Sequence, residues 1–242
     1  MNTNRKKATP LFVIGGFCLI LFITIASAIA TESNWVARFD LSWIEKIRGG
    51  IQPDKTAIVK FLTTLGSAET TIILTIVVVL ILFFLRKFVV GLWFGGTMLV
   101  CGVVLNLVLK SLVGRTRPAS VNWLVSESGF SFPSGHATAT AVFYGLAAMF
   151  LIFTVPKMWQ KIVIGIIGYG FILFVMYTRV YLGVHFPTDV LGGFFLGTAS
   201  VFISLGVYFL VRKPLHNLLV KWRIKDKSIT ELAYSRVFQI VN

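Results

Sequence analysis

Six long apolar runs dominate this sequence, and they constrain its fold more than any other feature. A helix needs roughly 20 apolar residues to cross a hydrocarbon core about 30 Å thick, and each run meets or approaches that length. The runs extend over Leu11–Ala30, Ala57–Leu85, Phe88–Leu109, Ala137–Val155, Lys161–Tyr177 and Asp189–Val211. The sequence therefore predicts an all-α integral membrane protein, with six transmembrane helices in one membrane domain that occupies residues 1–242.

Composition supports this class of protein and excludes two others. Hydrophobic residues make up 56% of the chain and charged residues only 13%, whereas a soluble domain carries about 25% charged residues. The net charge of +14 comes from basic residues in short segments between the apolar runs, so nucleic-acid binding is not expected. Cys18 and Cys101 lie inside apolar runs, which predicts small core residues without a disulfide or a metal site.

The first two runs each allow a second interpretation. Arg5-Lys6-Lys7 before the first run, and the small-x-small pattern Ala28-Ile29-Ala30 at its end, also describe a signal peptide. The apolar region of a signal peptide is about 7–15 residues long, and this run is longer, so we expect a retained helix. In the second run, Ile58–Leu65 has the pattern of an amphipathic approach to the apolar stretch Thr71–Leu85.

The distribution of Lys and Arg predicts the orientation in the membrane. With the N-terminus in the cytoplasm, 14 of the 23 Lys and Arg residues fall on the cytoplasmic side and nine on the outer side. Because cytoplasmic segments carry the excess of basic residues, both termini are expected in the cytoplasm.

Two segments outside the runs are amphipathic. Trp35, Phe39 and Trp43 recur every four residues, which favours a short interfacial helix on the outer leaflet; a lid over a functional site is the alternative. Residues of about 214–242 are expected to form a cytoplasmic amphipathic tail. The apolar face of this tail carries Leu215, Leu218, Leu219 and Trp222.

Three polar segments stand at the predicted outer ends of the runs. They are Lys110–Pro118, Phe132–His136 and Thr178–Asp189. Two of the three histidines of the chain lie in these segments. Because all three segments are predicted on one side of the membrane, we expect them to form one site.

The second segment has the features of a helix start that binds an anion. Ser134 directly precedes an apolar run, where it can cap a helix, and Gly135 leaves the backbone open to close approach. A helix N-terminus presents free N–H groups and a partial positive charge, which together bind phosphate. An ordinary helix start without a ligand is the alternative for this segment taken alone.

The third segment pairs a histidine with a carboxylate. His185 and Asp189 are four residues apart, and Pro187 suits the first position of the last helix. If the turn brings them together, Asp189 accepts the proton of one imidazole nitrogen, and the other nitrogen is left as an oriented nucleophile or base. A surface ion pair at a helix start is the alternative.

Three basic residues provide cations for an anionic ligand. Arg117 and Arg179 supply planar forks and Lys110 a point charge, the groups that bind phosphate oxygens. Lys110 and Arg117 are seven residues apart and can share a helical face, although Lys110 can also simply extend toward the membrane surface. Asn106, a polar residue within an apolar run, is expected to serve packing.

Together these groups fit the cleavage of a phosphate ester. The cations and the helix N-terminus neutralise the phosphate, His185 with Asp189 supplies a nucleophile, and His136 can protonate the departing oxygen. The carboxylates on the outer side are few, and none cluster like the ligands of a two-metal site. The predicted site therefore uses neither a metal nor a cofactor.

The three segments resemble the three-part signature of the type 2 phosphatidic acid phosphatase superfamily. The matching residues are Lys110-x6-Arg117-Pro118, Pro133-Ser134-Gly135-His136 and Arg179-x5-His185-x3-Asp189. Thr178 stands where the superfamily usually has serine, and it retains the hydroxyl group. The motifs agree in order and spacing, and the layout of six helices extends the resemblance over nearly the whole chain.

The resemblance implies a role for each motif residue. His185 would attack phosphorus and form a phosphohistidine, Asp189 would orient it, and His136 would protonate the leaving oxygen and then activate water. The residues that would hold the phosphate are Lys110, Arg117, Ser134, Gly135 and Arg179. Arg115 matches no motif position and is expected to be a surface charge, and His216 is expected on the inner side, outside the site.

The resemblance also implies a class of substrate. Bacterial members of this size dephosphorylate phosphatidylglycerophosphate, with phosphatidic acid and diacylglycerol pyrophosphate as side substrates. Undecaprenyl pyrophosphate is the close alternative, because the motifs recognise only the phosphate. A phosphotransferase is a further alternative, and so is a lipid-phosphate carrier or flippase, although transporters usually bind near the midplane of the membrane. The site is expected on the extracytoplasmic side of the cell membrane, and no obligate protein partner is implied.

Overall fold

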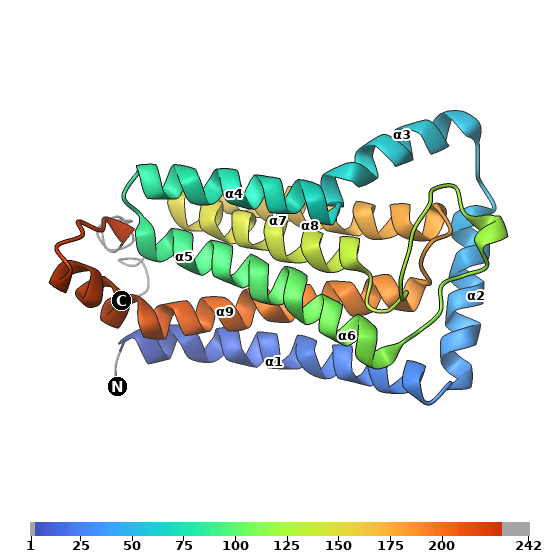
Figure 1. Cartoon of the computed structure of the whole chain (residues 1–242), viewed down its shortest axis with the longest axis horizontal. Helices are drawn as coiled ribbons and strands as arrows, with labels where there is room; N and C mark the ends of the chain where they lie inside the picture. The colour runs from blue at the N-terminus through green and yellow to red at the C-terminus, as the bar shows by residue number, and fades with distance from the viewer. Residues whose placement is uncertain (1–2, 229–242) are drawn as a thin grey trace.

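Within residues 3–228, which the computed structural model describes, every regular element is a helix (Figure 1). The elements are α1 (Thr3–Ala30), α2 (Asn34–Arg48), α3 (Pro53–Thr63), η1 (Thr64–Gly66), α4 (Ala68–Phe84), α5 (Phe88–Thr97), η2 (Met98–Val104), α6 (Leu105–Val113), η3 (Ser120–Asn122), α7 (Gly135–Thr154), α8 (Met158–Tyr181) and α9 (Pro187–Lys221). The predicted all-α class is confirmed.

Five helical segments of the described chain are long and apolar enough to cross a membrane, and a bent pair of helices provides a sixth when counted as one span. The five are α1, the continuous run from α5 through η2 to α6, α7, α8 and α9. The bent pair joins α3 and η1 to α4 at an angle of 45°. Ser67 begins α4 by accepting a hydrogen bond from the backbone N–H of Thr70, at 3.1 Å. The bend therefore lies where the sequence predicts an amphipathic approach to the second span.

The bundle has two distinct ends (Figure 1). At one end, which we call the site end, α2 lies across the ends of the spans, and the loop between α6 and α7 folds over the bundle. At the other, the terminal end, α1 begins and α9 ends. Arg48 of α2 donates hydrogen bonds to the Tyr181 carbonyl at 3.2 Å and the Asn122 carbonyl at 2.7 Å, so that α2, α8 and the loop are joined at the site end.

Close packing of α7 against α9 fixes the centre of the site end. A Cβ atom on Gly193 would lie 2.7 Å from the Ser134 carbonyl oxygen, and one on Gly197 would lie 2.6 Å from Ala141 Cβ. Only glycine allows this approach without displacement of the facing helix. The backbone N–H of Ser134 donates to the Asp189 carbonyl at 3.1 Å, so the starts of the two helices are held together.

The third span ends at a residue with a left-handed backbone conformation, after which the chain enters the loop. Gly114 follows α6 with a φ of 63°, and its N–H donates to the Lys110 carbonyl. This is the usual way to satisfy a helix C-terminus and change the chain direction. Lys110 thus lies in the last turn of α6, facing the loop that carries Arg115 and Arg117.

The last helix continues beyond its apolar run. The apolar pattern ends near Val211, but α9 continues through Pro214 to Lys221, so the first part of the expected amphipathic tail is helical and continuous with α9. After α9 the chain folds back toward the start of α5. Asp226 Oδ2 lies 2.8 Å from His216 Nδ1, and the N–H of Lys227 donates to the Arg86 carbonyl at 2.8 Å. The rest of the predicted tail, 229–242, lies outside the described residues.

Candidate active site

The structure brings the three polar segments together at the site end. His185 lies in the turn between α8 and α9, Arg179 in the last turns of α8, and Asp189 in the first turn of α9. Ser134 and His136 lie at the start of α7, directly against this turn. Arg179, His185, Asp189 and Ser134 are all at most 2% exposed, so the cluster is buried within the protein.

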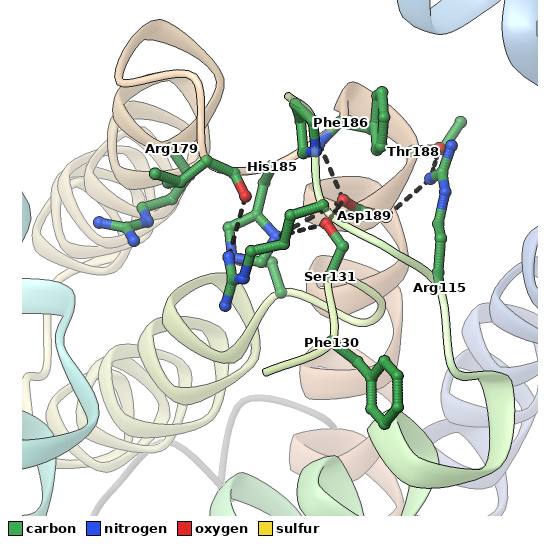
Figure 2. A network of polar contacts seen from close by, with 12 residues as sticks. Arg115, Phe130, Ser131, Arg179, His185, Phe186, Thr188 and Asp189 are labelled. Atoms are coloured by element: carbon green, nitrogen blue, oxygen red, sulfur yellow. Dashed lines mark hydrogen bonds and ion pairs between the residues drawn. The ribbon is translucent and has the colours of Figure 1, made fainter. Parts of the chain in front are cut away.

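His185 and Asp189 face each other, and Asp189 accepts several hydrogen bonds (Figure 2). The His185 Nδ1 lies 3.5 Å from Asp189 Oδ2. The same oxygen accepts a hydrogen bond from the backbone N–H of Phe186 at 2.8 Å and a short one from the Ser131 hydroxyl. These hydrogen bonds hold the carboxylate of Asp189 in place beside the imidazole, as the predicted orienting role requires.

The second imidazole nitrogen faces a cation. His185 Nε2 lies 3.1 Å from Arg117 Nη1. Because a guanidinium can only donate, Nε2 must accept, and the proton of the neutral ring is then on Nδ1, directed at Asp189. Burial lowers the pKa of His185 to about 4, against the opposing effect of Asp189. At neutral pH the ring is therefore neutral, and the lone pair of its unprotonated Nε2 is directed toward Arg117.

Arg115 is part of this network, and its prediction as a surface charge is wrong. Its side chain is only 15% exposed, and its guanidinium bonds Asp189 Oδ1 and Asp40 Oδ2, both at 2.7 Å. It also donates to the Thr188 hydroxyl at 2.7 Å and lies over the Phe186 ring at 4.1 Å. Arg115 thus joins the orienting carboxylate to α2, on the side of Asp189 away from His185 (Figure 2).

Asp40 anchors α2 to the first turn of α9. Its carboxylate accepts hydrogen bonds from the Thr188 backbone N–H at 2.8 Å and the Thr188 hydroxyl at 2.9 Å, besides Arg115. Asp40 is 2% exposed, and this burial raises the pKa of its carboxyl, while Arg115 acts in the opposite direction. α2 is therefore fixed to the bundle by a buried carboxylate next to the pair formed by His185 and Asp189.

The predicted phosphate-binding cations converge from three elements. Arg117 donates to the carbonyls of Ser128 at 2.9 Å, Gly129 at 3.0 Å and Val184 at 2.9 Å. Burial lowers the pKa of Arg117, although a guanidinium remains charged at neutral pH. The Lys110 ammonium donates to the Phe130 carbonyl at 2.6 Å.

The third predicted cation, Arg179, is the most deeply buried. It donates to the Thr63 hydroxyl at 3.3 Å and forms a short ion pair with Glu127, while its Nε has no hydrogen-bond partner among the described residues. A buried donor without a partner is costly, which is consistent with a site that binds a further acceptor.

The start of α7 presents the remaining predicted residues. Ser134 accepts a hydrogen bond from the Ala137 N–H at 3.4 Å and so acts as the N-cap. Gly135 faces α6, where an added Cβ would lie 3.6 Å from Asn106 Oδ1 and 3.9 Å from Lys110 Cε. Asn106 itself donates to the Thr138 hydroxyl at 2.9 Å, a packing contact between α6 and α7.

His136 completes the set of predicted site residues. It follows Gly135 in the first turn of α7 and is half-buried. The three predicted phosphate-binding cations, Lys110, Arg117 and Arg179, act on it electrostatically. His216, in contrast, lies at the terminal end against Asp226, away from the site. Within residues 3–228, no three His, Cys, Asp or Glu side chains cluster so as to hold a metal ion.

Sequence patterns missed three residues of this cluster: Asp40, Ser131 and Glu127. Asp40 lies in a segment whose aromatic spacing indicates a membrane-surface helix, where an acidic residue is expected to face water. Ser131 and Glu127 lie in the loop before the second motif, which has no periodicity. Arg115 offered a signal, because it lies two residues before Arg117 in the same outer segment.

Comparison with known proteins places the chain in a family. Residues 90–213 match the family described as the PAP2 superfamily. Phosphatidylglycerophosphatase B of Bacillus subtilis is 37% identical over 204 residues, which cover 77% of this chain and 91% of that protein. An undecaprenyl-diphosphatase of Sulfolobus acidocaldarius is 35% identical over 114 residues, which cover 45% of this chain and 50% of that protein.

A solved structure shares the fold. The crystal structure of the transmembrane PAP2 type phosphatidylglycerolphosphate phosphatase from Bacillus subtilis superposes with a TM-score of 0.69 and 34% sequence identity. The match covers 80% of this chain and 94% of that one. The helical bundle described above is therefore shared over most of both chains.

Proposed function

The chain belongs to the PAP2 superfamily and is a membrane lipid phosphatase, and from this premise we propose how it works and on which lipid. It hydrolyses phosphatidylglycerophosphate to phosphatidylglycerol and inorganic phosphate, through a phosphohistidine on His185. The observation that carries the mechanism is the orientation of this ring, with Nδ1 toward Asp189 and Nε2 toward Arg117.

The first step transfers the phosphoryl group to the enzyme. The Nε2 lone pair of His185 attacks phosphorus, the bond from phosphorus to the ester oxygen breaks, and His136 gives its proton to that oxygen. The imidazole becomes cationic as the new P–N bond forms, and Asp189 stabilises it through Nδ1–H. Arg115 and Asp40 hold Asp189 in place during this step.

The second step releases phosphate. His136, now neutral, takes a proton from water, and the water oxygen attacks phosphorus while the P–N bond breaks and its electron pair returns to Nε2. The equatorial oxygens stay neutralised by fixed donors, which is the main source of catalysis in phosphoryl transfer. These donors are Lys110, Arg117, Arg179 and the start of α7 at Ser134 and Gly135.

We also place the site end on the extracytoplasmic side, with both termini in the cytoplasm. The terminal end carries the basic ends of several helices, among them Arg5 in α1, Arg86 after α4 and Lys157 before α8. This distribution of charge supports a cytoplasmic terminal end.

Undecaprenyl pyrophosphate is the second candidate substrate. The similarity to a relative named undecaprenyl-diphosphatase favours it, but that match covers less of the chain than the match to phosphatidylglycerophosphatase B. Phosphatidic acid and diacylglycerol pyrophosphate are proposed as side substrates, because they present a terminal phosphate to the same cations.

Phosphate release by the protein purified in detergent tests the proposal. We expect hydrolysis of both phosphatidylglycerophosphate and undecaprenyl pyrophosphate, with the higher kcat/KM on the former, and no change when EDTA is added. Inactivity on both lipids would contradict the enzyme mechanism, and loss of activity with EDTA would contradict its independence of metals. A reversed order of kcat/KM would assign the second candidate as the substrate.

A further inference from the structure

A carboxylate lies where the proposed mechanism needs a phosphate. Glu127 Oε1 forms a short ion pair with Arg179 Nη2, and Glu127 Oε2 lies 3.5 Å from Arg117 Nη2. The two oxygens of one carboxylate thus face two of the guanidinium groups proposed to hold the substrate. Carboxylate and phosphate oxygens accept the same charge-assisted hydrogen bonds from arginine.

Glu127 reaches the arginines from the open side of the cluster. Its side chain is 23% exposed, whereas those of Arg117 and Arg179 are 6% and 2% exposed. The glutamate can therefore leave toward water, while the arginines are fixed within the bundle.

The loop that carries Glu127 also contacts the other basic groups. The carbonyls of Ser128 and Gly129 accept from Arg117, and the Phe130 carbonyl accepts from Lys110. Gly129 has a φ of 69°, a left-handed conformation that suits glycine and turns the chain at this point. The turn directs successive carbonyls at the cations and places Glu127 beside them.

Electrostatics explains why a carboxylate lies beside these arginines. Buried cations without a counter-ion are costly, and Glu127 supplies the counter-ion. The carboxylate of Glu127 and a phosphate dianion cannot occupy the same donors, because like charges repel and each arginine fork has a limited number of N–H groups.

We propose that Glu127 is a resident competitor of the substrate, which a phosphate group must displace from Arg117 and Arg179 in order to bind. The inference rests on the proposed role of these arginines in phosphate binding. It makes ligand entry an exchange of one anion for another, and it lowers the apparent affinity of every ligand that needs both arginines by one common factor.

Binding of inorganic phosphate tests this directly. It is measured for the purified full chain by the shift in melting temperature with phosphate concentration, and as competitive inhibition of lipid hydrolysis. We expect Glu127→Gln and Glu127→Ala each to tighten phosphate binding about tenfold and to lower KM for the lipid by the same factor. Glu45→Gln, which removes an exposed glutamate from α2, is the matched control and should leave both constants unchanged.

The outcomes separate this inference from the proposed function. Unchanged or weaker phosphate binding in both Glu127 variants, with an active wild type, would overturn the competitor and leave the phosphatase intact. Tighter phosphate binding in the variants of a protein that hydrolyses neither lipid would support the competitor and overturn the proposed mechanism. A gain in affinity is not the result expected from mere structural damage to the loop.

Discussion

Residues 3–228 contain two histidine–aspartate pairs, one near each end of α9, and the closer pair is the one outside the site. At the terminal end, His216 Nδ1 lies 2.8 Å from Asp226 Oδ2. At the site end, His185 Nδ1 lies 3.5 Å from Asp189 Oδ2. A short distance between an imidazole and a carboxylate therefore does not identify the catalytic pair.

The neighbours of each pair, and not the distance within it, distinguish the two pairs. Asp226 also accepts from the Ser228 hydroxyl at 2.7 Å and the Val89 N–H at 3.4 Å, so it fastens the segment after α9 to the start of α5. Burial acts to raise the pKa of Asp226, but these hydrogen bonds and the one from His216 outweigh it and lower the pKa.

At the site end the free nitrogen of the imidazole has a different neighbour. His185 Nε2 faces Arg117, one of the cations proposed to hold the phosphate. The proposed catalytic role of this pair therefore rests on the cations around it and on the orientation of the second nitrogen.

Removal of each imidazole should give the largest contrast. We expect His185→Ala to lower kcat about 10⁴-fold or more, because removal of a nucleophile that forms a covalent intermediate has effects of this order. His216→Ala should keep kcat within about twofold and lower the stability by about 1–3 kcal/mol, because Asp226 loses a charge-assisted hydrogen bond. Steady-state kinetics and thermal unfolding in detergent measure both. Comparable loss of kcat in the two variants would show that the pairs are not functionally distinct.

Neutralisation of one buried carboxylate at each end should give a smaller contrast: Asp40, which supports the site-end pair through Arg115, and Asp226, the acidic member of the terminal pair. Asp40→Asn weakens the link through Arg115 to Asp189, and we expect kcat to fall about tenfold with little change in KM, since misplaced catalytic groups lose rate before binding. Asp226→Asn should lower the melting temperature without this loss of kcat. A KM effect of Asp40→Asn that matches its kcat effect would place Asp40 in substrate binding instead of positioning.

Much of this arrangement could be predicted from local sequence. The spans follow from runs of apolar residues, and the starts of α7 and α9 follow from Ser134 and Pro187, which favour helix N-termini. His185 and Asp189 could be paired in advance because four residues across a helix start place them on one side of a turn. Each of these signals lies within a few neighbouring positions of the chain.

The contacts of Asp40, Arg115 and Glu127 could not be predicted from the sequence, because they depend on segments that are distant in the chain. Asp40 meets Arg115 only after α2 folds across the site end, and no local pattern encodes that crossing. Glu127 reaches Arg179 through a loop whose course depends on the left-handed Gly129. The length of the last helix also differs from its apolar pattern, because α9 continues through Pro214, a residue type that usually marks a helix end, to Lys221.

The two histidines also differ in burial, and this difference gives the smallest of the expected effects. The His185 side chain is 2% exposed and that of His216 24%, and burial lowers the pKa of His185 from 6.5 to about 4. Between these two values the unfolded chain binds the proton that the folded protein excludes, so the free energy of unfolding should fall as the pH decreases from 6.5 to 4.

His185→Gln isolates this contribution, because glutamine does not titrate. We expect the melting temperatures of the wild type and the variant to change in parallel above pH 6.5, and that of the wild type to fall several degrees more steeply from pH 6.5 to 4. Thermal unfolding in detergent at a series of pH values measures the two curves. Curves that stay parallel down to pH 4 would mean that His185 titrates alike in the folded and unfolded states, and burial would then not lower the pKa of its imidazole.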